Sequence, residues 1–293
     1  MLKAVALLLL FCSACCVQAR TDVGPIFNYT DQDSWSANPD WTCNGSVYMR
    51  QSPIDIITAD VVRNRSLMNL QFAGYDRQWT GNWTNVGRNM RFITGDHNIS
   101  MTNHLGTYNW AQFHFHWGPN STYGSEHTIN GQRFAGEIHH AFLKRDGAST
   151  DEDYINVIGV FLEVDDSMPL TGSWLTLFNN IRNESQGVAR VTVTPSEFLP
   201  TDPSYYYYAG AQVSPPCHET VHFFIMRSTL TVPTMWLERL RHIESFEGPP
   251  LVQNLRVVQP SYNRRVSTQD SGANGLGSSL GLLILVMVVR ALY

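Results

Sequence analysis

Two histidines separated by one residue lie in an apolar, aromatic stretch, Gln112-Phe113-His114-Phe115-His116-Trp117. In a β-strand, alternate side chains point to the same side, so His114 and His116 would share one face and the aromatic rings the other. A third histidine, His139, lies in a second strand-like segment, residues 134–143. Three neutral imidazoles that converge on one point suit zinc, whose catalytic sites take three protein ligands and leave a fourth position open. The pattern therefore predicts a β-sheet that carries a catalytic metal centre.

The neighbours of these histidines distinguish a metal site from histidines on a polar surface. Isolated pairs with this spacing also occur on exposed strands and indicate little by themselves. Gln112 precedes His114 by two positions, and Glu137 precedes His139 by two, so each shares a strand face with its histidine. Metal-ligating imidazoles need such partners to hold the second ring nitrogen. The neighbours therefore favour a metal site.

The order and spacing of longer motifs carry a resemblance to a known family. The segments A-Q-F-H-F-H-W-G, G-S-E-H-T and E-I-H-H begin at Ala111, Gly124 and Glu137. They resemble the α-class carbonic anhydrases, and the resemblance covers about residues 25 to 267. It extends to the segment Gln51-Ser52-Pro53-Ile54-Asp55-Ile56, to the loop from Gly210 to Glu219, and to Asn254, Arg256, Gln259 and Pro260.

The fold predicted for the chain is mainly β (α+β). Strand-like segments rich in β-branched and aromatic residues span 111–117, 134–143, 155–164, 188–194 and 219–226. Helical spacing of apolar residues occurs from Trp174 to Ile181 and after Pro233, and the Tyr205–Tyr208 tract is interpreted as packing. A chain of 293 residues with 43% hydrophobic residues can bury one large core. We expect one domain, residues 20–267, with a large, mostly antiparallel, twisted central sheet and a few peripheral helices.

The resemblance also implies a role for each site residue. His114, His116 and His139 would bind Zn²⁺, and hydroxide formed on the metal would attack CO₂. Gln112, Glu137 and the backbone of Asn254 would hold the three ligands. The family orients its nucleophile with a threonine that donates a hydrogen bond to a glutamate, here Glu126. Val213 stands in the threonine's place, and Ser214 or water would compensate in part.

Further departures concern the pocket and the exit of protons. Ala141 and Phe223 would replace larger wall residues, Val157 keeps the apolar type, and Gln212 replaces an apolar residue. Arg88 stands near the position of the family's proton-shuttle histidine, and a guanidinium cannot titrate near neutrality. His97 and His104 are alternative candidates for the proton shuttle, although either could also be an ordinary surface histidine. Tyr29 resembles a tyrosine at the mouth of the family's pocket, and its alternative interpretation is a packing residue.

Two functional hypotheses follow. The leading one is zinc-dependent, reversible hydration of CO₂ to bicarbonate and a proton, slowed by Val213 and Arg88. The alternative is a carbonic-anhydrase-like, zinc-bearing binding or adhesion ectodomain with little catalysis. A zinc peptidase is disfavoured because the chain lacks the expected H-E-x-x-H pair in a helical segment; His218 to His222 have that spacing but overlap the strand-like segment 219–226. A formal charge of −5 without a basic block disfavours nucleic acid as a partner.

The ends and cysteines of the chain indicate the secretory pathway. Residues 1–19 have the pattern of a cleaved signal peptide, so the mature protein would keep only Cys43 and Cys217. These two cysteines would pair as a disulfide, as in secreted members of the family. The alternative is two buried free thiols. Seven asparagines lie in N-x-S/T acceptor motifs, of which a majority are expected to be glycosylated: Asn28, Asn44, Asn64, Asn82, Asn98, Asn120 and Asn183.

The C-terminal tail, residues 268–293, predicts attachment to the extracellular face of the plasma membrane. Its last 14 residues are apolar apart from Arg290, which is short of the roughly 20 residues that span a bilayer. Small residues near 271–274 followed by a polar spacer favour a glycosylphosphatidylinositol (GPI) anchor signal. A short transmembrane tail and a poorly ordered hydrophobic end are the alternatives.

Overall fold

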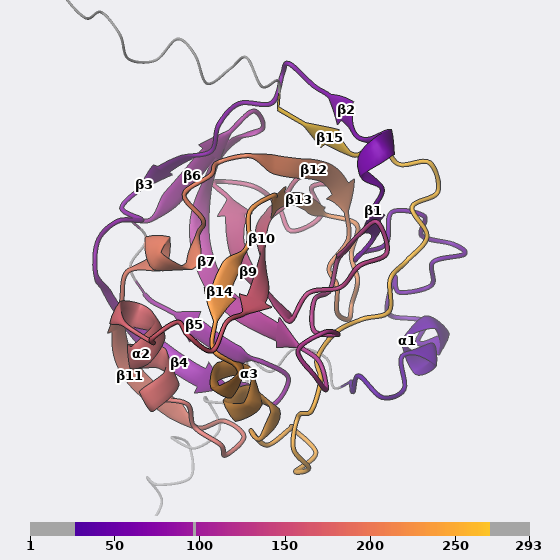
Figure 1. The fold of residues 1–293 in the computed structure, drawn as a ribbon. Coiled ribbons are helices and arrows are strands. Elements are labelled where there is room, and N and C mark those ends of the chain that lie inside the picture. Colours follow the sequence, from indigo (N-terminus) through magenta and orange to yellow (C-terminus); the bar gives the residue numbers. More distant parts are fainter. Residues whose placement is uncertain (1–26, 96–97, 270–293) are drawn as a thin grey trace, which may run out of the picture.

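A large twisted sheet dominates the computed structural model, which describes residues 27–95 and 98–269 (Figure 1). Within this part of the chain, 13 strands join in the order β11-β4-β5-β7-β9-β10-β13-β12-β15-β2, with β14 beside β10 and β3-β6 beside β7. The strands are β2 (Val62–Arg63), β3 (Gln71–Ala73), β4 (Trp79–Asn85), β5 (Met90–Ile93), β6 (Ser100–Asn103), β7 (Gly106–Trp117), β9 (Gly136–Lys144), β10 (Ile155–Val164), β11 (Val188–Val193), β12 (Tyr205–Gly210), β13 (Val221–Met226), β14 (Leu230–Val232) and β15 (Ser267–Thr268).

Most neighbouring strands run antiparallel, which confirms the predicted fold class. Parallel pairing occurs between β10 and β13, between β10 and β14, and between β15 and β2. A separate parallel pair joins β1 (Asp55–Ile56) to β8 (Thr128–Ile129). Strand β10 is buried along most of its length, as expected for a central strand covered on both faces.

Strand β7 begins at Gly106 rather than at residue 111, and a β-bulge interrupts its pairing with β9 between Trp110 and Gln112. Simple alternation would place Trp110 on the same face as Gln112. The bulge shifts the phase, so the Trp110 ring joins Phe113 in the aromatic core while Gln112 faces the other side. The histidine face of β7 therefore begins directly after the bulge.

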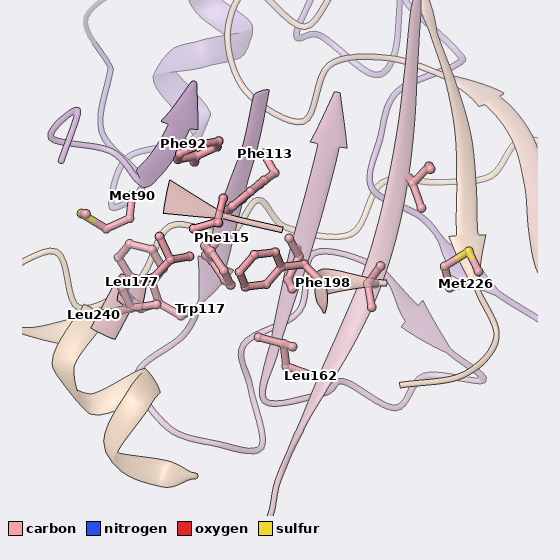
Figure 2. Close-up of a cluster of buried hydrophobic side chains, with 14 of the residues drawn as sticks. Met90, Phe92, Phe113, Phe115, Trp117, Leu162, Leu177, Phe198, Met226 and Leu240 are labelled. Carbon is pink, nitrogen blue, oxygen red and sulfur yellow. The ribbon is translucent and has the colours of Figure 1, made fainter. Parts of the chain in front are cut away.

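Large aromatic side chains fill the opposite side of the sheet. Phe113, Phe115 and Trp117 of β7 are fully buried in this cluster, together with Phe92 of β5 and Phe198 (Figure 2). The rings of Phe92 and Phe113 stack at 5.2 Å, and those of Phe113 and Phe198 lie 4.8 Å apart. One face of β7 thus anchors the strand, which leaves its other face to carry polar side chains.

Two short helices pack against the aromatic side of the sheet, where Trp174 and Trp236 contact Phe115. α2 (Gly172–Asn179) packs against β11, and α3 (Thr234–Arg241) begins directly after Pro233 and buries Trp236, Leu237 and Leu240. α1 (Asp33–Ala37) and the 3₁₀ turns η1 (Thr58–Asp60) and η2 (Pro195–Phe198) complete the described helices. Both helical segments predicted from sequence are confirmed. None of the helices in residues 27–95 and 98–269 has the length and hydrophobicity of a membrane span.

A disulfide joins Cys43 to Cys217 across 174 residues, with the Cα atoms 5.0 Å apart. The predicted pairing is therefore confirmed, and the alternative of two free thiols is wrong. The bond attaches the N-terminal segment to the loop that follows β12. Residues 1–19 and 270–293, which carry the predicted signal segment and most of the predicted anchor signal, lie outside the described residues.

Candidate metal centre

Three histidines converge on one face of the central sheet. His114 on β7 lies directly opposite His139 on β9, and such cross-strand partners point to the same side. His116 follows two residues after His114 and shares its face. One ring nitrogen from each of the three histidines lies within 4.8 Å of the other two. The structure therefore brings together the three ligands predicted from sequence.

The other ring nitrogen of each histidine is held by a hydrogen-bond acceptor. Nδ1 of His114 lies 2.8 Å from Oε1 of Gln112, and Nδ1 of His116 lies 2.8 Å from the backbone oxygen of Asn254. Nε2 of His139 lies 2.7 Å from Oε1 of Glu137. Each acceptor requires a proton on the nitrogen that faces it, so the tautomer of each ring is fixed by its partner. The structure thus places Gln112, Glu137 and Asn254 against the three histidines, and their roles in supporting metal ligands stay a prediction.

This arrangement fits a cation. With their protons on Nδ1, His114 and His116 direct bare Nε2 atoms at each other across 2.9 Å. Two lone pairs at that distance repel unless a positive charge lies between or beside them. A set of three neutral imidazoles is the donor set that Zn²⁺ takes in catalytic sites. Zinc therefore fits the residues present.

Burial keeps two of the rings in the neutral, ligating form. The pKa of His114 is lowered well below its ordinary value by burial and by the neighbouring His116 and His139. The pKa of His139 is lowered by burial and by His116, against the opposing effect of Glu137. Burial also acts to lower the pKa of His116, but the Glu126 carboxylate and the Asn254 carbonyl outweigh it and raise that pKa.

Glu137 is the centre of a buried hydrogen-bond network. Besides His139, its Oε1 lies 2.8 Å from Nδ1 of His127, and its Oε2 accepts the backbone N–H of His127 at 2.9 Å. Nε2 of His127 then lies 2.6 Å from the hydroxyl of Tyr208. Burial acts to raise the pKa of Glu137, but the two imidazoles lower it well below its ordinary value. The carboxylate is therefore held ionised beneath His139.

The sequence analysis missed two members of this network, Tyr208 and His127. The packing interpretation of the Tyr205–Tyr208 tract fits Tyr205 and Tyr208, which are both fully buried, but it leaves out the hydrogen bond of Tyr208 to His127. The alternation of side chains along β12 gives Tyr208 the opposite face from Tyr207. His127 lies next to Glu126 in the motif G-S-E-H-T, so the motif contained the signal for one of the missed residues.

Glu126 is fully buried beside His116. Its Oε2 accepts the backbone N–H of Arg256 at 3.0 Å, and its Oε1 lies 3.0 Å from Nδ1 of His116. The Nδ1–H of His116 points at the Asn254 carbonyl, however, and Glu126 Oε1 receives no hydrogen bond. Glu126 therefore approaches a ligand histidine while one carboxylate oxygen lacks a donor.

Apolar side chains form a wall beside the histidines. Ala141 on β9 pairs with Val157 on β10, and Val157 pairs with Phe223 on β13, so these three side chains share a face. Val213 packs in the same buried cluster as Val157 and Phe223. The neighbouring residues of the loop between β12 and β13, Gln212 and Ser214, are only half-buried. The predicted pocket residues Ala141, Val157 and Phe223 thus lie together with Val213.

One arginine that was not predicted, Arg91, lies beside the histidines, whereas the predicted Arg88 packs on an aromatic ring. Arg91 on β5 pairs directly with His114 and acts to lower its pKa. Arg88 lies over the ring of Phe27 at 4.7 Å, and burial lowers its pKa despite the opposing effect of Tyr29. Arg91 was missed because its position depends on which strand pairs with β7.

The alternative shuttle histidines receive no support from the geometry. The ring of His104 packs at 4.8 Å against Tyr207, on the opposite face of the sheet from Tyr208 and the metal ligands. His97 lies outside the described residues. Tyr29 is buried among the rings of Phe27 and Trp35, in accordance with the packing interpretation.

Comparisons with known proteins point to one family. The family model "Eukaryotic-type carbonic anhydrase" matches residues 30–270. The chain is 30% identical over 230 residues to mouse "Carbonic anhydrase 1", with 74% of this chain and 88% of the relative covered. It is 31% identical to horse "Carbonic anhydrase 3", with 74% and 88% covered, and 32% identical to bovine "Carbonic anhydrase 6", with 80% and 76% covered.

Proposed function

Because the chain belongs to the eukaryotic-type carbonic anhydrase family, we propose that it catalyses the reversible hydration of CO₂ to bicarbonate and a proton with zinc at His114, His116 and His139. One observation carries the proposal. Each imidazole has one nitrogen tied to an acceptor and the other aimed at a common point, which is the arrangement of a catalytic zinc site.

The chain's own residues would bind the metal, orient its ligands and hold the substrate. When bound, zinc supplies a strong nucleophile from water near neutral pH, chemistry for which this family is a standard example. Gln112, Glu137 and Asn254 fix the direction of the three imidazoles. CO₂ carries no charge and would lie against the apolar wall of Val157 and Phe223. This wall binds water weakly, so CO₂ can displace water from it.

We expect the reaction to be slow because Val213 provides no hydrogen-bonding group. A threonine hydroxyl at this position would connect the reacting oxygen to Glu126. Losing one positioned hydrogen bond at a reacting oxygen typically costs about 10²–10³ in rate. Ser214, which is half-buried next to Val213, would compensate in part.

Proton release would depend on buffer. Arg88 lies near the family's shuttle position, and although burial lowers its pKa, a guanidinium stays charged near neutral pH. His104 faces away from the ligands, so the described residues offer no evident imidazole shuttle on the histidine face. We therefore expect turnover to rise with buffer concentration more steeply than in a shuttle-equipped enzyme.

The alternative is a zinc-bearing binding ectodomain, and the substitution Val213→Thr separates the two functions. The enzyme hypothesis predicts that turnover rises by about 10²-fold, because the hydroxyl restores the missing hydrogen bond. Stopped-flow CO₂ hydration measures the change, with zinc content determined on each sample. Val213→Ala is the matched control, since it changes the size of the side chain without adding a hydroxyl. An unchanged rate in a zinc-loaded Val213→Thr protein would favour the binding ectodomain.

We further propose that the protein is a glycosylated, GPI-anchored ectodomain on the cell surface. The disulfide between Cys43 and Cys217 is typical of an oxidising compartment. All seven acceptor asparagines lie at exposed or half-buried positions. Treatment of expressing cells with phosphatidylinositol-specific phospholipase should release the protein into the medium. Retention on the cells would instead favour a short transmembrane tail.

A further inference from the structure

The two oxygens of the buried Glu126 carboxylate have unequal surroundings. Oε2 accepts a hydrogen bond from the backbone of Arg256, whereas Oε1 accepts none. Leaving a buried, charged acceptor without a donor is costly. The nearest donor given by the structure is Nδ1 of His116, at 3.0 Å. A role for Glu126 has to account for this short approach.

The same His116 nitrogen lies 2.8 Å from the Asn254 carbonyl, only slightly closer than it lies to Glu126. One N–H can be shared between two acceptors in a three-centre hydrogen bond. A small rotation of the imidazole toward Glu126 would establish that sharing. The rotation would leave Nε2 on the side of His114 and the other ligand atoms.

We propose that Glu126 is a positioning residue for the metal ligand His116, whose Nδ1–H it accepts together with Asn254. Glu126 would then support His116 as Glu137 supports His139. Carboxylates behind two of the three ligands would make both rings stronger donors to the metal. This inference rests on the proposed zinc site and adds a second carboxylate–histidine pair to it.

Val213 makes this role available. A hydroxyl at position 213 would donate to Glu126 and draw Oε1 away from His116. Valine has no proton to offer, and Val213 is buried in an apolar cluster. The native valine, which is expected to slow the reaction, would therefore also strengthen zinc binding. This predicts opposite effects of Val213→Thr on turnover and on zinc affinity.

Zinc affinity, measured by chelator competition on the purified full chain, provides the first test. Outer partners of ligand histidines typically contribute 10–100-fold to metal affinity. Glu126→Gln should weaken zinc binding by about 10-fold or more, because His116 and Arg256 approach different terminal atoms of residue 126 and only one of the two is an acceptor in glutamine. Val213→Thr should weaken binding in the same direction, whereas the matched Val213→Ala should not. Unchanged affinity in both Glu126→Gln and Val213→Thr would overturn the proposal.

The NMR resonance of the His116 Nδ1 proton is the second test, because a purely structural role would not move it. Hydrogen bonding to a carboxylate shifts such a proton downfield, so the resonance should move upfield in Glu126→Gln and Val213→Thr and stay in Val213→Ala. If Glu126→Gln does not fold, Val213→Thr decides alone, because it removes no buried polar group. A wild-type resonance in Val213→Thr would contradict the proposal.

These measurements distinguish failure of the inference from failure of the proposed function. If the protein binds zinc and loses affinity as described but hydrates no CO₂, the inference stands and the enzymatic function fails. If it hydrates CO₂ while both variants keep wild-type zinc affinity, the inference fails and the function stands.

Discussion

Gly159 on β10 lies directly opposite His139, at a point where the sheet has no room for a side chain. A Cβ atom there would lie 2.8 Å from Oε1 of Glu137 and 2.6 Å from Cδ1 of Ile225. The isoleucine can change rotamer, but Glu137 is fixed by its hydrogen bonds to His127 and His139. The absence of a side chain at Gly159 therefore preserves the support of a metal ligand.

We predict that Gly159→Ala weakens zinc binding by about 10–100-fold, because displacing Glu137 releases His139. Chelator competition measures the change. Gly95→Ala is the control, since a Cβ atom at Gly95 would meet nothing within 4 Å. A folded Gly159→Ala protein that binds zinc as tightly as wild type would show that Glu137 does not control the metal site.

The sequence predicted the site residues that lie close to one another along the chain. His114, His116 and Gln112 share a face because strand alternation is fixed over a few residues. Arg91 could not be assigned, since its place beside His114 depends on the pairing of β5 with β7. His104 faces the other side because β6 and the following turn fold over Tyr207, a relation that its own neighbours do not encode.

At the level of elements, strand positions were more predictable than their phase or neighbours. β10 has the bounds expected from its apolar run, Ile155–Val164. β7 extends further toward the N-terminus than expected. Its alternation of side chains is broken at the bulge next to Trp110, so the pattern in the sequence could be followed only up to that point. The order of strands in the sheet depends on contacts between segments far apart in sequence, so local patterns could not predict it.

The disulfide connects two segments that also meet through buried polar contacts. Gln51 donates its side-chain amide to the backbone oxygen of Cys217 at 3.3 Å, and Thr42 donates its backbone N–H to Pro216 at 2.9 Å. Arg256 holds the N-terminal segment from a third part of the chain, through the backbone oxygens of Cys43 and Ser52, both at 2.9 Å. Burial lowers the pKa of Arg256 to about 10 despite the opposing effect of Glu126. The loop that carries Val213 is therefore attached to the N-terminal segment by more than the covalent bond.

Replacing both cysteines, Cys43→Ser with Cys217→Ser, should lower the free energy of unfolding by about 4–5 kcal/mol in the chain-entropy model, because the bond closes a very long loop. Urea unfolding at pH 7 measures the difference. The contacts of Gln51 and Thr42 with the loop should keep the native arrangement, so zinc affinity is expected to remain near wild type. Equal stability of the two proteins would contradict the prediction.

For the whole molecule, stability should depend on pH through a half-buried histidine of β13 that is not one of the metal ligands. Burial lowers the pKa of His222 to about 4, which outweighs the nearby Asp153 carboxylate, and Nδ1 lies 2.6 Å from the hydroxyl of Tyr207. Below about pH 6.5 the unfolded chain gains a proton at this residue that the folded chain does not. Stability contributed by neutral His222 is therefore complete above that pH and is lost as the pH falls toward 4.

We predict that His222→Asn flattens this dependence by up to about 1.4 kcal/mol per pH unit between pH 6.5 and 4. Asparagine keeps an acceptor for Tyr207 but does not titrate. Urea unfolding at several pH values measures the slope, and the exposed His218→Asn variant controls for loss of an imidazole. An unchanged slope in His222→Asn would show that other groups control acid stability.

The central claim, that this chain is a zinc enzyme, is tested most directly by stopped-flow CO₂ hydration in strong buffer, with zinc content measured on the same sample of purified protein. We predict one zinc ion per chain and a rate well above the buffer background, both lost in His114→Ala. One zinc ion per chain with no hydration above background would contradict the claim and identify a metal-bearing binding protein.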